Sequence, residues 1–372
     1  MNTQLYDSAL LPIRLKSVPE HFQVIEDMQV SLNNAGEHLW LWIEKRLLTT
    51  DIVRSILAKA FNVNIRDIQY AGKKDKHAVT QQWFSLRLPG TATTVQLSAP
   101  QVVAKFLTQS PLYEGESLVV LQAQVHQKKC QTGCHNGNFF RVQAVLEAGS
   151  GDHISQSKLD ASARSIMALG TVNLFGEQRF LGIQSLTDLD AALTAMPKKI
   201  NPTRLKPKQA WTCSQVRSFL FNQLVQVRKS QLQLWCRPQV GDVVQLVGSK
   251  SVFIVTEDDD LPNIVARAKQ HDIVVTGPLF GAGGVTPSAK IAELEQSVLE
   301  QLSPDGIKVL LKLQTSSRRA LIVKPKEFKV RLERNDSNSS LHFEFWLPVG
   351  SYATVCIEDF VSNYLVSEVS GA

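Results

Sequence analysis

The order of local patterns along the chain places the tightest limit on its fold. Up to about Gly149, short strand-like stretches recur, for example residues 38–43. Helical spacing dominates the middle, and strand-like alternation returns after about Ala320, for example in residues 341–345. This order predicts one domain that is built from both ends of the chain and interrupted by another domain.

Spacing and turn residues place individual elements. A helix is expected from about Thr50, which would be its N-cap, with Ile52, Ile56, Leu57 and Ala60 on one face. Further strands are expected at residues 82–88, 119–125, 139–146 and 243–247. Helices are expected at 155–169, at 214–228 and within 288–312, and an extended loop around Pro197, Pro202 and Pro207.

Composition narrows the class of protein. A chain of 372 residues usually forms more than one domain, and 44% hydrophobic residues are ordinary for a globular protein. A net charge of +6 and a pI near 9.0 favour a polyanionic partner. We expect a soluble cytoplasmic protein, because no run reaches about 18 apolar residues and residues 1–16 lack a signal-peptide pattern. Five scattered cysteines fit a reducing compartment.

One carboxylate lies within a cluster of lysines. Asp75 is surrounded by Lys73, Lys74 and Lys76 and should stay ionised, because nearby positive charge stabilises an anion. Lysines that attract phosphate, next to an aspartate that attacks, would suit an enzyme acting on RNA. A solvated surface turn explains these residues about as well when they are considered alone. Gly72, which permits close backbone approach, shifts the balance towards a rigid functional loop.

Several motifs together resemble one enzyme family. Residues 70–84 closely resemble the signature of the tRNA pseudouridine synthase D (TruD) family, roughly Ala-Gly-x-Lys-Asp-(Lys or Arg)-x-Ala-Val-Thr-x-Gln. The resemblance continues in the family's order at residues 19–24, 36–39, 137–140, 175–180, 217–222 and 347–354. This ordered set spans nearly the whole chain and is far more specific than any one motif.

The resemblance implies both an architecture and an activity. The fold would be α+β: a pseudouridine synthase catalytic domain with a mixed, largely antiparallel sheet, formed by residues 1–160 and 321–372 and interrupted by an inserted α/β TRUD domain at 161–320. The activity would be isomerisation of uridine to pseudouridine in tRNA, usually at position 13 in the D arm. No cofactor is expected, because nothing is oxidised and no energy is supplied, and we expect a monomer. Two alternatives stay open: a noncatalytic tRNA-binding protein or chaperone, and an enzyme that modifies another RNA or another uridine.

The same resemblance implies roles for particular residues. Asp75 corresponds to the catalytic residue, acting on C1′ as a nucleophile or on the C2′ proton as a base. Asn138 and Phe140 fall in the active site, and residues two apart on a strand share one face. A flipped uridine needs the stacking and hydrogen bonds that an aromatic ring and an amide supply. A turn asparagine and a core aromatic are the alternative interpretation.

Three further residues match positions at or near the family's substrate. Phe22 and Tyr352 correspond to residues that contact it, although core packing explains both aromatics without a substrate. Lys16 would bind phosphate or pair with Asp75, with an ordinary surface lysine as the alternative. The chain departs from the family pattern at Tyr352, where some members have Phe, and at His21, where Asp is usual.

The remaining basic residues are considered as RNA ligands, and one group of cysteines and histidines is considered as a metal site. RNA phosphate contacts are expected from Lys73, Lys74, Lys76, Lys128, Lys129 and Arg217, with a solvated basic surface as the alternative. Four potential zinc ligands lie close together in sequence: His126, Cys130, Cys134 and His135. Their spacing does not fit a zinc site, so no metal is expected.

Overall fold

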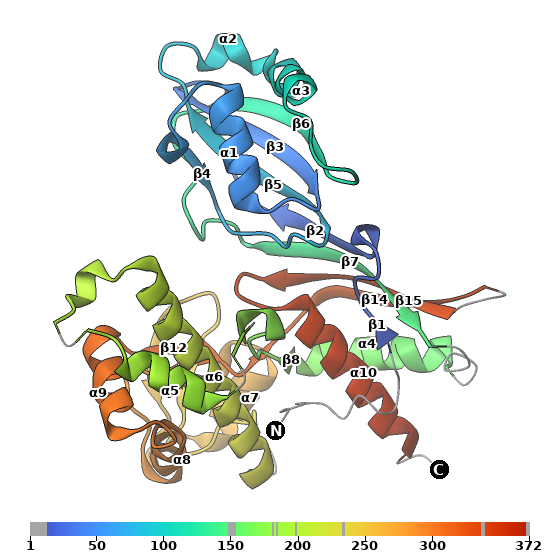
Figure 1. Ribbon diagram of the computed structural model, residues 1–372. Helices are drawn as coiled ribbons and strands as arrows, with labels where there is room; N and C mark the ends of the chain where they lie inside the picture. Colours follow the sequence, from blue (N-terminus) through green and yellow to red (C-terminus); the bar gives the residue numbers. More distant parts are fainter. Residues whose placement is uncertain are drawn as a thin grey trace. The chain divides into compact units, whose positions relative to one another are not determined.

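The computed structural model describes residues 13–147, 154–180, 182–183, 185–197, 199–232, 235–335 and 339–369, with side chains up to residue 362. They form two compact units (Figure 1). The described residues within Ser8–Ala168 and Pro325–Gly350 form the nine-stranded unit, and Leu169–Lys324 with Ser351–Ser362 form the four-stranded unit. Most of the segment considered for a signal peptide lies outside these residues. Within them, no helix combines the length and the apolar character needed to cross a bilayer.

The nine-stranded unit is organised around one mixed sheet. Its main strand order is β14 (Lys326–Arg334), β15 (Ser339–Pro348), β7 (Gly137–Leu146), β2 (Phe22–Asp27), β5 (Val79–Arg87), β3 (His38–Arg46) and β6 (Ser117–His126). The short strands β1 (Ile13–Arg14) and β4 (Ile68–Tyr70) pair with β7 and β5. The β2–β5 pair is parallel and the other pairs are antiparallel. The predicted mixed, largely antiparallel sheet is therefore confirmed.

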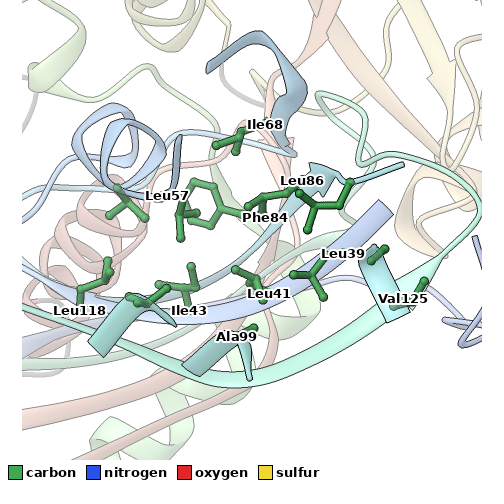
Figure 2. Close-up of a cluster of buried hydrophobic side chains, with 14 of the residues drawn as sticks. Leu39, Leu41, Ile43, Leu57, Ile68, Phe84, Leu86, Ala99, Leu118 and Val125 are labelled. Carbon is green, nitrogen blue, oxygen red and sulfur yellow. The ribbon is translucent and has the colours of Figure 1, made fainter. Parts of the chain in front are cut away.

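A buried apolar cluster covers one face of this sheet. Figure 2 shows that it draws on β3, β5, β6 and helix α1, through side chains such as Leu41, Phe84, Leu118 and Leu57. Helices α1 (Thr50–Ala60), α2 (Ala92–Gln96), α3 (Ala99–Gln109) and α4 (Gln156–Leu169) also belong here, with 3₁₀ turns at Pro19–His21 and Ile65–Asp67. The cluster holds α1 against β5, the strand that follows the Asp75 loop.

The start of α1 differs from the prediction in a useful way. Thr49, not Thr50, is the N-cap, and its side chain accepts a hydrogen bond from the Ile52 amide. The helix buries Val53 and Leu57, while Ile52 is exposed. Thr50 is buried one position inside the helix, so its hydroxyl is available to neighbouring segments.

The four-stranded unit combines a smaller sheet with most of the helices. Its strand order is β10 (Val252–Ile254), β9 (Val243–Leu246), β11 (Ile273–Leu279) and β12 (Ser317–Ala320), and β8 (Thr171–Val172) pairs with β13 (Ile322–Val323). The helices are α5 (Leu186–Thr194), α6 (Pro207–Gln231), α7 (Leu261–Lys269), α8 (Ala289–Leu299), α9 (Pro304–Leu313) and the first part of α10 (Ala353–Val369), with 3₁₀ turns at Glu177–Phe180 and Pro202–Arg204. The prediction of an extended loop through Pro207 is wrong, because this proline starts α6, where a missing N–H costs nothing.

Candidate active site

The loop that carries Asp75 occupies residues 71–78, between β4 and β5. Its backbone is held by buried polar side chains. The Thr50 hydroxyl accepts a hydrogen bond from the Lys74 amide at 2.9 Å and donates to the Gln82 side chain at 2.9 Å. The Gln82 amide in turn donates to the Gly72 carbonyl at 3.0 Å. These bonds join the loop to α1 and β5, so the loop has the fixed geometry that a catalytic group requires.

A buried lysine supports the loop directly beneath Asp75. Lys45 lies on β3, and its ammonium donates to the backbone carbonyls of Asp75 and Leu48, both at 2.7 Å. Burial lowers the pKa of Lys45 to about 8, although the negative charge of Asp75 acts in the opposite direction. Lys45 therefore ties the chain at Asp75 to the strand below it.

The Asp75 carboxylate lies beside a second ammonium and an aromatic ring. The Lys16 Nζ is 3.2 Å from Asp75 Oδ2 and 4.0 Å from the centroid of the Phe22 ring. The side chain of Asp75 remains 30% exposed and that of Lys16 16% exposed. Of the two roles expected for Lys16, the structure contains the pairing with Asp75. A carboxylate that is held rigidly yet accessible can act as a nucleophile or as a base.

Phe22 and Phe140 lie next to this pair on adjacent strands. Their ring centroids are 6.2 Å apart with an edge-to-face geometry, and Phe140 also stacks on Phe345 at 5.5 Å. Both side chains are buried, so they pack as core residues in the free protein. Their position beside Lys16 is compatible with a role against a bound base, which stays a prediction.

Asn138 is joined to the residue before Asp75. The Lys74 Nζ donates to Asn138 Oδ1 at 2.6 Å and lies 2.9 Å from Glu26 Oε2. The side chains of Lys74 and Glu26 are only 4% and 0% exposed. Burial raises the pKa of Glu26, and the charge of Lys74 opposes that rise. Lys74 was expected to contact RNA phosphate. In the free protein its ammonium instead contacts the side chains of Glu26 and Asn138.

The other side of the loop is closed by the segment before β7. The Gly133 amide donates to the Ala71 carbonyl at 2.7 Å. A Cβ atom at Gly72 would lie 3.0 Å from the buried His135 ring, so glycine permits the close approach expected there. Burial lowers the pKa of His135 to about 4, which keeps the ring neutral near pH 7.

The remaining predicted RNA-binding lysines of this unit are exposed. Lys73, Lys76, Lys128 and Lys129 have exposed side chains, and Lys73 pairs with Asp51 at 2.7 Å. Such surface pairs contribute little to stability and can exchange one anion for another. These four side chains can therefore meet a phosphate backbone.

Two predicted site residues belong to the four-stranded unit. Tyr352 packs edge-on against Phe175, with centroids 6.1 Å apart, and a Cβ atom at Gly176 would lie 2.9 Å from its ring. Arg217, on α6, donates hydrogen bonds to Leu279 on β11, to Gln314 and Thr315 in the loop before β12, and to Ser317 on β12. These bonds join α6 to neighbouring segments of its own unit, and a phosphate contact by Arg217 stays a prediction.

Glu26 and Lys45 were not predicted as part of the site, yet the sequence contains a signal for both. Lys45 follows Leu39, Leu41 and Ile43 in a strict alternation, so it points to the same buried face. Glu26 likewise continues the inward series of Phe22 and Val24. A charged residue in an inward position of an apolar strand indicates a buried polar contact.

Two cysteines lie close together in the segment before β7. The sulfur atoms of Cys130 and Cys134 lie 3.8 Å apart, and burial raises the pKa of the Cys130 thiol. Over the described ranges, no cluster of three or more His, Cys, Asp or Glu side chains could hold a metal ion. Around Asp75 the side chains supply a carboxylate, an amide and ammonium groups.

Comparison with known proteins identifies the family. The sequence pattern of the family described as tRNA pseudouridine synthase D (TruD) matches residues 1–192 and 183–360. A tRNA pseudouridine synthase D from Stutzerimonas stutzeri is 34% identical over 355 residues, covering 94% of this chain and 92% of the relative, and one from Pseudomonas putida is 35% identical over 360 residues, covering 93% and 90%. A crystal structure assigned to the TruD protein of Methanosarcina mazei has the same fold, with a TM-score of 0.69 at 20% identity, over 97% of this chain and 96% of that one. The chain therefore belongs to the tRNA pseudouridine synthase D (TruD) family.

Proposed function

We propose that this protein isomerises uridine to pseudouridine in tRNA, at position 13 of the D arm, with Asp75 as the reacting carboxylate. The observation that carries the proposal is the accessible Asp75 side chain, 3.2 Å from Lys16, on a loop held from beneath by Lys45. Family membership and relatives named as tRNA pseudouridine synthases support the reaction type.

The proposed reaction rearranges bonds within one nucleotide. The N1–C1′ bond of uridine is cleaved, the uracil rotates, and C5 bonds to C1′. C5 then loses its proton and N1 gains one, so the product is an isomer of uridine. Asp75 acts either by attacking C1′ or by removing the C2′ proton. Because the product is an isomer of the substrate, the reaction requires no oxidant, reductant or added group.

The target base must leave its stack to reach Asp75. Base flipping places a nucleotide against side chains that stack on it and bind its polar edge. Phe22, Phe140 and Asn138 supply these groups beside Asp75, and the exposed lysines Lys73 and Lys76 supply charge for the flanking phosphates. Tyr352 is proposed as a further stacking residue. We propose that one chain is sufficient and that the reaction takes place in the cytoplasm, where the tRNA is.

Single-nucleotide mapping of pseudouridine tests this function. Unmodified tRNA transcripts are incubated with the purified protein, and pseudouridine is expected at position 13 and at no other uridine of the D arm. Pseudouridine at a different position would contradict the proposed site. Tight tRNA binding without any pseudouridine would overturn the enzymatic function and favour a tRNA-binding protein.

A further inference from the structure

The Lys74 side chain, next to Asp75 in sequence, links the buried Glu26 and the half-buried Asn138. Its Nζ lies 2.9 Å from Glu26 Oε2 and donates to Asn138 Oδ1 at 2.6 Å. Glu26, on β2, is the direct cross-strand partner of Asn138 on β7, and its other carboxylate oxygen accepts the Trp83 amide at 3.1 Å. The ammonium therefore joins one side chain from each of two paired strands of the sheet.

This contact determines which way the Asn138 amide faces. An ammonium group only donates hydrogen bonds, so the atom of Asn138 that meets Lys74 must be the acceptor, Oδ1. The Nδ2 group then points away from Lys74, and in the described part of the chain it donates no hydrogen bond. Asn138 is half-buried, and its Nδ2 is not one of the described side-chain atoms that are fully buried without a partner, so this donor keeps some exposure.

We propose that Lys74 is a positioning residue, which orients Asn138 so that its NH₂ group donates to a carbonyl of the flipped base and selects uracil over cytosine. This inference rests on the proposed function. Lys74 acts through Asn138 and does not touch the reacting atoms. Uracil presents a carbonyl at C4, whereas cytosine presents an amino group there, which would meet the Asn138 donor with another donor. A hydrogen-bonding site rejects an analogue that leaves its buried groups unpaired.

The rotation of the base makes a fixed donor especially suitable for uracil. Bringing C5 to C1′ requires a half-turn about the axis through N3 and C6, which exchanges the positions of O2 and O4. A donor held by Lys74 therefore meets a carbonyl oxygen both before and after the rotation. In cytosine the same half-turn exchanges a carbonyl with an amino group, so one of the two orientations loses the hydrogen bond.

A double-mutant cycle tests whether Lys74 acts through Asn138. The paired change Glu26→Gln with Lys74→Met avoids leaving a lone buried charge, and it should lower the single-turnover rate about ten- to hundredfold. In an Asn138→Ala background, the same pair should change the rate less than about twofold. Full additivity, or a wild-type rate in the paired variant, would overturn the proposal.

A second variant guards against misfolding. Asn138→Asp keeps an acceptor for Lys74 and nearly the same shape but removes the NH₂ donor. We expect it to retain the wild-type melting temperature within a few degrees and to lose rate about ten- to hundredfold. An Asn138→Asp protein that turns over at the wild-type rate would show that the donor is not used.

Salt dependence separates this role from phosphate binding. Each phosphate contact adds about 0.7–0.9 to the slope of log affinity against log salt concentration. Lys76→Met, in the same loop, should reduce that slope by this amount, whereas the paired Glu26 and Lys74 variant should leave it unchanged. A reduced slope in the paired variant would assign Lys74 to the RNA backbone instead.

The amide orientation is also measurable without RNA. The Asn138 side-chain signals in a ¹⁵N–¹H spectrum are assigned by their loss in Asn138→Ala. They should shift in the paired variant and stay in place in Lys76→Met. If the wild-type protein makes no pseudouridine but these shifts occur, the proposed function fails and the orientation by Lys74 stands. If the signals do not move in the paired variant, the inference fails whatever the activity.

Discussion

Asp75 of the nine-stranded unit and Asp242 of the four-stranded unit are each paired with a cation. Lys16 approaches Asp75 at 3.2 Å, and their side chains are 16% and 30% exposed. Two nitrogens of Arg228 each lie 2.8 Å from an Asp242 oxygen, and the two side chains are 2% and 0% exposed. The backbone amide of Gln239 also donates to Asp242 at 2.8 Å. The difference shows that the exposure of the carboxylate, not the presence of a charge pair, indicates which of the two can meet a substrate.

The strongest test of this contrast removes the cation from each pair. Arg228→Met should lower the free energy of unfolding by about 3–5 kcal/mol, because it leaves the Asp242 charge buried without its partner. Lys16→Met should lower it by about 0–1 kcal/mol, since solvent screens an accessible pair. Urea denaturation followed by circular dichroism measures both. Equal losses would remove the structural distinction between the two pairs.

A pH titration of stability examines Lys45, the buried lysine that binds the backbone at Asp75. The pKa of Lys45 is about 8 in the folded protein and about 10.4 in an unfolded chain. Between these values the unfolded chain binds more protons, so the contribution of Lys45 to stability rises with pH. The cost of burying its charge is fully present below pH 8 and is removed as the pH rises towards 10.4.

Lys45→Met provides the comparison for that titration. The difference in unfolding free energy, wild type minus variant, should be flat below about pH 8 and rise by up to about 1.4 kcal/mol per pH unit between 8 and 10. Denaturant unfolding at several pH values measures it. A constant difference from pH 7 to pH 10 would mean that Lys45 does not carry the buried charge.

The aromatic residues beside Asp75 allow a finer test. Phe140→Leu keeps most of the volume but removes the aromatic face, so turnover should fall by the equivalent of about 1–3 kcal/mol, the value of a base–aromatic stack. Phe345→Leu is the matched control, because Phe345 stacks on Phe140 from within the core. Both variants should lose less than about 1.5 kcal/mol of stability. Equal turnover in the two would place Phe140 in the core alone.

Much of the fold followed from local patterns. Alternating apolar residues predicted β3, β5, β7 and β15 close to their observed bounds, because the period of two is a direct consequence of strand geometry. The helix from Thr50 was also predicted, but the cap was misplaced by one residue, since adjacent threonines satisfy the same pattern. The ordered motifs, not local chemistry, led to the family.

The contacts that charged side chains make were much harder to predict. Lys73, Lys74 and Lys76 are equivalent in sequence, yet Lys74 alone among these three is buried against Glu26. Arg217 lies on α6 but donates hydrogen bonds to Thr315 in the loop before β12 and to Ser317 on β12. Such contacts depend on segments tens of residues away, and the spacing within a motif holds no information about them.

The single-turnover rate of Asp75→Asn tests the central claim most directly. The substitution keeps the shape of the side chain and the backbone bond to Lys45 but removes the charged oxygen. The account predicts that pseudouridine formation falls at least about a thousandfold while the Kd for tRNA stays within about threefold of wild type. A variant that forms pseudouridine within about tenfold of the wild-type rate would contradict the assignment of Asp75 as the reacting carboxylate.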